Sequence, residues 1–221
     1  HVTGVQTCAL PIFHLYGLMA DMDAITTLAE KHGLAIIEDA AQAIGSSYTS
    51  RKFGKTLKAG SVGHVGAFSF FPTKNLGACG DAGLATTQDA TLAKTLKQLR
   101  NHGDESKYSH SMIGANFRLD AIQAAILSVK LPYLEEQHQK REENGRYYNQ
   151  HLNSVVKTPT IPDGYRMIFN QYTIRTPKRN ELQSYLTENQ IGSCVYYPIP
   201  MHLQKCFDYL GHKPGDFPET E

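Results

Sequence analysis

Apolar and polar positions alternate with a helical period soon after Phe13, where the chain becomes well patterned. A stripe of apolar side chains at helical spacing predicts a helix over residues 22–32: Met22, Ile25, Leu28 and Ala29. Asp21 is suited to cap the start of this helix, and Gly33 is placed to end it. The almost uninterrupted apolar run LAIIEDAA (34–41) follows directly and is typical of a buried parallel strand. A helix leading into such a strand is half of a βαβ crossover.

Two more strands and another helix follow in the first half of the chain. HVGAFSFF (64–71) has the pattern of a second buried strand, and GLATTQ (83–88) resembles a third. The segment ATLAKTLKQLRNHG (90–103) is helical in pattern. The order of these elements predicts an α/β domain built on a mixed or parallel sheet.

The second half of the chain reads differently. Residues 118–151 are a long helical stretch that Pro132 should end or kink near Leu131. Beyond it we expect a strand at FNQYTIRT (169–176), a helix at KRNELQSYLTENQ (178–190) and a strand at SCVYYPIP (193–200). We therefore predict part of a large α/β domain over residues 13–131, and a connecting helix with an incomplete small α+β domain over residues 132–221.

The first twelve residues do not share this order. The segment VTGVQTCALPI (2–12) shows neither helical nor strand periodicity, and it back-translates without a mismatch into a sequence that looks like a common sequencing-library adapter. We interpret residues 1–12 as non-native read-through, and exclude them from the reasoning about the fold. On this interpretation a native N-terminal part is missing.

Composition narrows the class of protein. In 221 residues, 22 basic and 21 acidic side chains leave a net charge of +1, which favours no nucleic-acid partner. No apolar run is long enough to cross a bilayer, and no segment resembles a signal peptide. The four cysteines have neither zinc nor redox spacing, so we expect free thiols in the cytoplasm and no metal site.

Polar residues follow the predicted strands at the ends where open α/β sheets bind ligands. Asp39 and Gln42 come at and after the end of the first strand, while Ser69 and Lys74 occupy the end of the second strand and the loop PTKNLGACGDAG. Singly, each has an ordinary interpretation: a helix cap, a backbone-bonded hydroxyl, a surface lysine in a turn. Together they describe a site for an anionic aromatic cofactor held by a lysine imine, because a neutral lysine is a nucleophile.

Four blocks carry a family resemblance. The blocks IIEDAAQAIGSSY, GAFSFFPTKNLGACGDAGLATT, LRNHG and IGANFRLDAIQAAIL resemble the DegT/DnrJ family of sugar-nucleotide aminotransferases, from about Phe13 to Glu221. The resemblance implies the aspartate-aminotransferase fold, which is fold type I of the enzymes that depend on pyridoxal 5′-phosphate. It also implies further family sequence before Phe13 and beyond Glu221.

The resemblance assigns roles to particular residues. Lys74 would form the imine with the cofactor aldehyde and, once freed, move a proton between substrate and cofactor. Asp39 would keep the pyridine nitrogen protonated, which makes the ring an electron sink. Gln42 would lie against the ring, and Ser69 would bind the phosphate. Asn116, in GANFR, would reach the phosphate of a neighbouring subunit, which implies a homodimer with shared active sites.

The substrate follows from the same resemblance. His202, in VYYPIPMHLQKCFDYLG, would approach a sugar nucleotide, although a histidine in such a loop is as readily structural. Arg118 would bind a sugar carboxylate with its planar fork, or would instead pair with Asp120 or a backbone carbonyl at a helix start. The pattern looks most like members that aminate 3-keto sugars, particularly UDP-linked 2-acetamido-3-keto uronic acids, with glutamate as donor, in amino-sugar or polysaccharide biosynthesis.

Two alternatives stay open at this point. Some chains with this fold are described as sensors or regulators, so a non-catalytic protein that binds pyridoxal phosphate is one of them. The other is a sugar dehydratase of the same family. Those members have histidine in place of the lysine, so Lys74 speaks against it.

Overall fold

The computed structural model describes residues 9–221, so the part of the read-through prediction that concerns residues 1–8 lies outside the described residues. Contacts divide the chain into a unit over Thr7–Tyr172 and a unit that includes Thr173–Glu221. Within this chain the contacts group the connecting helix with the first unit. The predicted boundary after residue 131 concerns the domain plan of the whole protein and stays a prediction.

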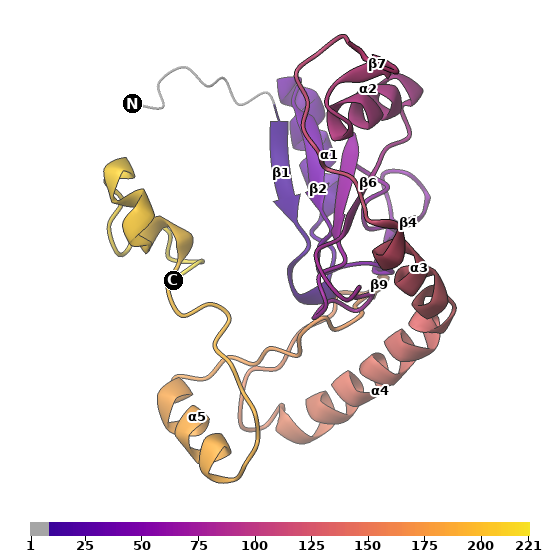
Figure 1. The fold of residues 1–221 in the computed structure, drawn as a ribbon. Coiled ribbons are helices and arrows are strands. Elements are labelled where there is room, and N and C mark those ends of the chain that lie inside the picture. Colours follow the sequence, from indigo (N-terminus) through magenta and orange to yellow (C-terminus); the bar gives the residue numbers. More distant parts are fainter. Residues whose placement is uncertain (1–8) are drawn as a thin grey trace. The chain divides into compact units, whose positions relative to one another are not determined.

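A four-stranded sheet forms the centre of the first unit (Figure 1). Its order is β1 (Ala9–Phe13), β2 (Ala35–Asp39), β5 (Val65–Ser69) and β6 (Gly83–Thr86). The first three strands are parallel and β6 runs antiparallel to β5. The strands predicted within residues 34–41, 64–71 and 83–88 are confirmed, and the sheet is mixed.

Strand β1 was not expected, because residues 9–12 show no strand periodicity. The segment pairs in register with β2, with Phe13 opposite Asp39. Pairing of an edge strand uses backbone N–H and C=O groups on one side of the segment, so side-chain alternation is not required, and Pro11, which has no N–H, is tolerated at an edge. That residues 1–12 are non-native read-through is a statement about their origin and stays a prediction.

Helix α1 (Met22–His32) is confirmed together with both of its predicted ends. The side chain of Asp21 accepts a hydrogen bond from the Ala24 N–H, and Gly33 adopts φ 61°, a left-handed conformation that suits glycine. Met22 and Ala29 are buried against a core that includes Ile36, Ala40 and Tyr48. Helix α1 therefore covers one face of the sheet.

The opposite face of the sheet is open. Side chains alternate along β2, so Ile36 and Glu38 are buried while Ile37 is 39% exposed. Phe13, on the same open face, is 40% exposed. The expectation of a strand buried on both faces is therefore wrong for this chain, because among residues 9–221 a helix covers the face of Ile36 alone.

Smaller elements surround the central sheet. Strands β3 (Ser47–Ser50) and β4 (Lys55–Lys58) form a hairpin that β9 (Tyr165–Arg166) extends in antiparallel fashion. Helix α2 (Ala90–Arg100) confirms the predicted helix at this position, and the short strands β7 (Asp104–Ser106) and β8 (Ser109–His110) follow it. The sequence did not predict the hairpin or the two short strands.

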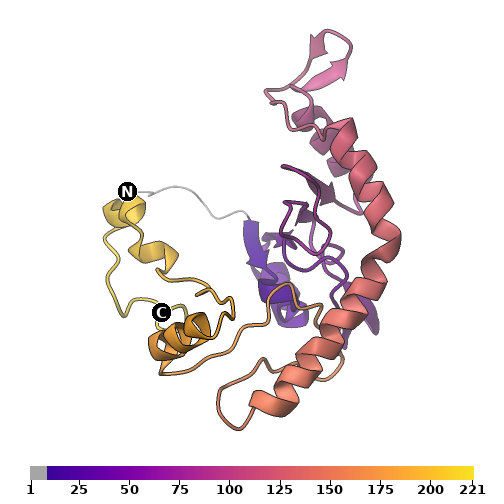
Figure 2. The same cartoon turned by 60° about the horizontal axis from the view of Figure 1, so that its bottom comes forward.

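The long helical stretch is interrupted as predicted. Helix α3 (Ala121–Lys130) leads through the 3₁₀ turn Leu131–Tyr133 into α4 (Leu134–Leu152), and Figure 2 shows them as one bent run. Pro132 lies in the turn, where its missing N–H and fixed φ end the α-helical pattern. Helix α4 packs on the rest of the first unit through buried His138 and through the carboxylate of Glu142, which accepts from the Arg166 Nε at 2.7 Å.

The second unit contains α5 (Arg179–Glu188) and the 3₁₀ turns Met201–Leu203 and Lys205–Leu210. Helix α5 confirms the prediction for residues 178–190. The strand predicted over residues 193–200 is absent, and Pro198 and Pro200 have no N–H to give to a ladder. No helix within residues 9–221 has the length and apolar character needed to cross a membrane.

The strand predicted over residues 169–176 is also wrong. Phe169 adopts φ 45°, which breaks an extended conformation. The neighbouring backbone N–H groups donate to loop carbonyls instead of a strand, Ile168 to Gly17 at 3.0 Å and Asn170 to Tyr16 at 2.9 Å. The apolar pattern arises here from an irregular buried segment.

Candidate active site at the sheet edge

Two of the predicted side chains lie at one edge and on one face of the central sheet. Asp39 is the last residue of β2, and Ser69 is the last residue of β5. Asp39 pairs with Ala67, so Ser69 lies two positions further along the neighbouring strand. Because side chains two positions apart point to the same face, the carboxylate and the hydroxyl share the open face.

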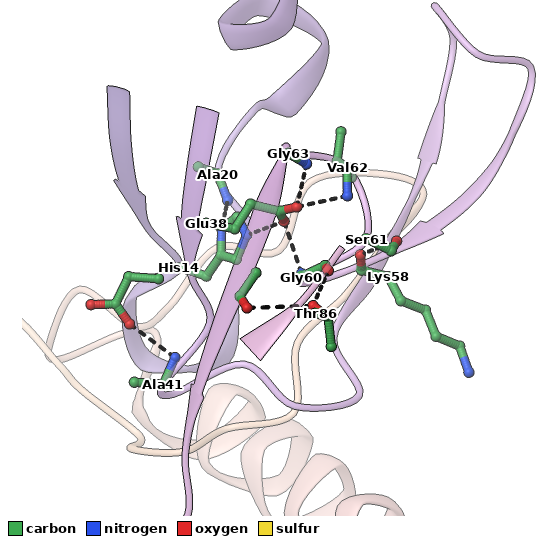
Figure 3. A network of polar contacts seen from close by, with 12 residues as sticks. His14, Ala20, Glu38, Ala41, Lys58, Gly60, Ser61, Val62, Gly63 and Thr86 are labelled. Atoms are coloured by element: carbon green, nitrogen blue, oxygen red, sulfur yellow. Dashed lines mark hydrogen bonds and ion pairs between the residues drawn. The ribbon is translucent and has the colours of Figure 1, made fainter. Parts of the chain in front are cut away.

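The backbone fixes the position of Asp39 from both sides. The His14 N–H donates to the Asp39 carbonyl at 3.0 Å, and the Ala40 N–H donates to Ala67 of β5 at 2.8 Å. The carboxylate Oδ1 accepts from the Ala41 N–H at 3.0 Å, a bond drawn in Figure 3. Oδ2 makes no hydrogen bond with any part of the chain that the structure describes, so it remains available to a ligand.

Lys74 lies in the loop between β5 and β6, which is anchored on both sides. Its N–H donates to the Phe71 carbonyl at 2.9 Å, and the Ala78 N–H donates to the Phe70 carbonyl at 2.7 Å. Lys74 itself is half-buried, and its amine has no hydrogen-bond or ion-pair partner among residues 9–221. The loop turns tightly at Gly77, where a Cβ would lie 2.5 Å from the Pro72 carbonyl oxygen.

Ser69 and Gln42 are both engaged by backbone groups. The Ser69 Oγ accepts from the Phe71 N–H at 3.2 Å, which leaves its proton free to donate. Gln42 is 4% exposed, and its Oε1 accepts from the Tyr16 N–H at 2.7 Å. The oxygen of Gln42 is therefore held by the loop that follows β1.

The buried hydrogen-bonded pair formed by Glu38 and His14 was missed in the sequence analysis (Figure 3). Both side chains are fully buried, and the His14 Nε2 lies 2.8 Å from the Glu38 Oε2. The Ala20 N–H donates to the His14 Nδ1, so Nε2 carries the ring proton and donates to Glu38. The only signal in the sequence was an acidic residue at an inward position of an apolar strand.

Three backbone N–H groups complete the shell of the Glu38 carboxylate: Gly60 at 2.9 Å, Val62 at 2.6 Å and Gly63 at 2.5 Å. Burial by itself would raise the pKa of Glu38, but the hydrogen bonds from His14 and these amides hold it below its usual value. The ionised carboxylate thus fastens β2 to the segment that leads into β5. Asp39, the next residue, is positioned by the same strand.

Asn116 and Arg118 come together at a second place in the first unit. The Asn116 Oδ1 accepts from the Arg118 N–H at 3.3 Å, and the Arg118 guanidinium donates to the Asn101 Oδ1 at 2.8 Å. Both residues are exposed. Among residues 9–221, Arg118 therefore pairs with a side-chain amide, and neither with Asp120 nor with a backbone carbonyl.

His202 belongs to the second unit. Its Nε2 lies 2.8 Å from the Glu221 Oε1, and its ring packs 4.7 Å from the ring of Phe217, measured between centroids. The three described cysteines, Cys79, Cys194 and Cys206, are free and exposed.

The sheet-edge residues suit a cofactor with an aldehyde, a basic ring nitrogen and an anionic group. Within residues 9–221, Lys74 offers an unpaired amine, Asp39 offers an unpaired carboxylate oxygen, and Ser69 offers a hydroxyl proton. These are the groups that pyridoxal 5′-phosphate requires of a protein. The side chains present fit that cofactor.

Comparison with known protein families agrees with this cofactor. The model of the DegT/DnrJ/EryC1/StrS aminotransferase family matches residues 2–221. The chain belongs to this family. The resemblance seen in the sequence motifs is therefore confirmed.

Relatives in the family differ in their described roles. A pleiotropic regulatory protein of Geobacillus stearothermophilus is 48% identical over 100% of this chain and 58% of its own length. A UDP-N-acetyl-3-dehydro-α-D-glucosamine 3-aminotransferase of Acidithiobacillus ferrooxidans is 44% identical over 91% of this chain and 53% of its own. A dTDP-3-amino-3,4,6-trideoxy-α-D-glucose transaminase of Streptomyces venezuelae is 42% identical over 98% of this chain and 56% of its own.

A solved structure shows the same fold. The crystal structure of S. venezuelae DesV in complex with a ketimine intermediate matches with a TM-score of 0.89 and 40% identity, over 96% of this chain and 56% of that one. The expectation of the aminotransferase fold is confirmed. The chain spans about half the length of the curated relatives it matches.

Proposed function

We propose that the protein uses pyridoxal 5′-phosphate to transfer an amino group from glutamate to a keto-sugar nucleotide. One observation carries the proposal. In a member of this aminotransferase family, the unpaired amine of Lys74 follows the strand that pairs with β2, and β2 ends at the unpaired oxygen of Asp39.

The residues divide the work between them. When bound, pyridoxal 5′-phosphate supplies an aldehyde that condenses with amines and a ring that accepts electrons. With the cofactor bound, Lys74 would hold its aldehyde carbon, and the Lys74 amine, once free, would accept and return the proton of the substrate carbon. The Asp39 Oδ2 holds a proton on the ring nitrogen, Ser69 donates to the phosphate, and Gln42 supports the ring.

The proposed substrate is a 3-keto sugar nucleotide. The names of the A. ferrooxidans and S. venezuelae relatives both place the amino group at C3, one on a UDP sugar and one on a dTDP sugar. We propose the UDP-linked sugar, with Arg118 and His202 as candidate substrate contacts. Asn116 would contact the phosphate of a neighbouring subunit in a cytoplasmic homodimer, and the product would enter amino-sugar or polysaccharide synthesis.

A second candidate is a regulatory protein that binds the cofactor and does not complete the reaction. The 48% identity to a pleiotropic regulatory protein favours it. Lys74, Asp39, Gln42 and Ser69 are all present, which favours the enzyme. The dehydratase alternative has no such support, since position 74 is lysine.

The two candidates differ in their response to glutamate. The purified protein loaded with pyridoxal phosphate should convert it to pyridoxamine phosphate when glutamate is added, as followed by absorbance and mass spectrometry. The Lys74→Ala variant is the control and should form none. A protein that binds the cofactor at Lys74 and leaves it unconverted would support the regulator.

The nucleotide is decided by the second half-reaction. The pyridoxamine form should be consumed by a UDP-linked 3-keto sugar faster than by its dTDP-linked counterpart. Faster consumption by the dTDP sugar would contradict the assignment to UDP, and consumption of a 4-keto sugar alone would contradict C3.

A further inference from the structure

The residue after Lys74 is anchored more firmly than Lys74 itself. Asn75 is 7% exposed, and both ends of its carboxamide are bonded within the first unit. Its Nδ2 donates to the Ile168 carbonyl at 3.2 Å, and its Oδ1 accepts from the Asn170 Nδ2 at 2.8 Å. The loop that presents the lysine is thus tied to a segment more than ninety residues away in sequence.

That segment is in turn bonded to the loop that holds Gln42. The Asn170 N–H donates to the Tyr16 carbonyl at 2.9 Å, and the Tyr16 N–H donates to the Gln42 Oε1 at 2.7 Å. A continuous path of side-chain and backbone hydrogen bonds therefore runs from Asn75 through Asn170 and Tyr16 to Gln42. Two candidate cofactor residues on separate loops share one support.

Helix α4 also contacts this segment, at Phe169. The Arg141 guanidinium donates to the Phe169 carbonyl at 3.0 Å. The Phe169 ring lies so close to Gly145 that a Cβ there would be 2.5 Å from the ring. Met167, Ile168 and Phe169 are all buried.

Two residues on or next to this path have strained backbones. Tyr16 has φ 59° and Phe169 has φ 45°, which side chains larger than glycine rarely adopt. The Asn170 Oδ1 and the Gln171 Oε1 are buried without a hydrogen-bond partner among residues 9–221. Strained backbone and unsatisfied buried acceptors concentrate at functional sites, where the surrounding structure must hold them in place.

We propose that Asn75 and Asn170 are a positioning pair that fixes the Lys74 loop relative to the Gln42 turn. They act through the hydrogen bond between their side chains, and neither is a catalytic residue. The proposal rests on the proposed function only in the role it gives to Lys74. A plain packing role for the two amides would stabilise the fold without controlling the lysine.

The test measures the reactivity of Lys74 in the 221-residue chain without cofactor. The chain is acylated with limiting acetic anhydride, and the rate at Lys74 is compared by mass spectrometry with the rate at exposed Lys55 in the same sample. The variants are Asn75→Ala, Asn170→Ala and the double variant. The control is Asn149→Ala, since Asn149 also uses both ends of its amide, on Pro159 and Tyr172, and has no hydrogen bond to the Lys74 loop.

Loss of the pair should release the loop and expose the amine. Each single variant should raise the acylation rate of Lys74 relative to Lys55 by about threefold or more. A change of this size lies at the lower end of the effects found for residues coupled in one hydrogen-bond network. The double variant should match the larger single effect, because both changes break the same link. Asn149→Ala should leave the ratio unchanged.

Several results would overturn the proposal. One is an unchanged ratio of Lys74 to Lys55 acylation rates in a folded Asn170→Ala chain. Another is a double variant in which the two single effects on this ratio multiply. The third is an equal rise of the ratio in Asn149→Ala. Should Asn75→Ala fail to fold, Asn170→Ala decides alone, because Asn170 is less buried. The readout uses no cofactor or substrate, so failure of the proposed transamination would leave this test intact.

Discussion

Asp39 and Lys74 show how much a single residue's role depends on the groups left unpaired around it. Asp39 gives one carboxylate oxygen to the Ala41 N–H and keeps the other free, while the Lys74 amine has no partner among residues 9–221. The sequence placed both residues because they follow predicted strands. It could not show that Tyr16, Asn75 and Asn170 support them, because those contacts join segments distant in sequence.

The charge of Asp39 can be separated from its structural bond. Asp39→Asn keeps an oxygen for the Ala41 N–H and loses the negative charge. If that charge holds a proton on the cofactor ring, kcat for transamination should fall by about 100-fold or more, in the range found for loss of one electrostatic catalytic group. Cofactor affinity, measured by fluorescence titration, should change much less. A variant that binds weakly yet turns over normally would contradict this role.

The lowered pKa of His138 leads to a prediction of how the free energy of unfolding depends on pH. Burial lowers the pKa of His138 from 6.5 to about 4. The positive charges of Arg166 and Arg141 lower it further, and the negative charge of Glu135 partly opposes them. The unfolded chain takes up this proton near pH 6.5 and the folded chain only near pH 4. The contribution to stability is therefore full above pH 6.5 and is lost as the pH falls towards 4.

The comparison is the His138→Gln variant, which cannot titrate. Urea unfolding from pH 7 to 4.5 should show the stability of the original chain falling more steeply than that of the variant. Parallel curves would mean that His138 titrates normally in the folded state.

Among the elements, helix α1 binds the β3–β4 hairpin chiefly through the carboxylate of Asp23, and Lys52 of the hairpin also pairs with Glu30 of α1. Asp23 accepts from Tyr48 Oη at 2.8 Å, Ser50 Oγ at 2.5 Å and the N–H groups of Arg51 and Lys52 at 2.8 and 3.0 Å. Desolvation opposes ionisation, but these hydrogen bonds lower the pKa of Asp23 to about 2. The hairpin was absent from the sequence prediction because its support comes from this remote side chain.

Removing that charge should loosen the hairpin. Asp23→Asn should lower the melting temperature at pH 7 by several degrees, since four donors lose a charged acceptor. The difference from the original chain should shrink as the pH falls from about 4 to 2, because the stability from a lowered carboxyl pKa is lost on acidification. Thermal unfolding followed by circular dichroism measures both, and Glu143→Gln on the exposed surface of α4 is the control. An effect that grows with acid would contradict the assignment.

The contact between α4 and the turn after Gln42 also gives a prediction. Gly45 has φ 91°, and a Cβ there would lie 2.6 Å from the His138 Cε1. Gly45→Ala should cost about 1 to 3 kcal/mol of unfolding free energy, from backbone strain and crowding together. Gly33→Ala, at φ 61° with open space around it, is the matched control and should cost less. Equal losses would place the whole effect in the backbone.

Whether an element was predicted correctly depends on whether local or distant contacts determine it. Helix α1 was predicted to its caps because Asp21 and Gly33 act locally. Residues 169–176 were predicted as a strand because an apolar run does not reveal whether its backbone will pair with a strand or with loop carbonyls. The latter holds here, through Tyr16 and Gly17.

The whole chain is a member of the DegT/DnrJ/EryC1/StrS aminotransferase family that spans about half the length of its curated relatives. Its central sheet carries α1 on one face, and Asp39 and Ser69 lie on the other. The family and the fold were predictable because the motifs are contiguous. The choice of UDP or dTDP sugar was not, because relatives of both kinds are similarly close.

The most direct test of this account is reductive trapping of pyridoxal phosphate on the purified chain. The chain is incubated with the cofactor, reduced with borohydride, digested and examined by mass spectrometry, with Lys74→Arg as the control. We predict one adduct, on the peptide that contains Lys74, and none at that position in the variant. Adducts scattered over many lysines, or a full-yield adduct at another lysine in both proteins, would contradict Lys74 as the cofactor lysine.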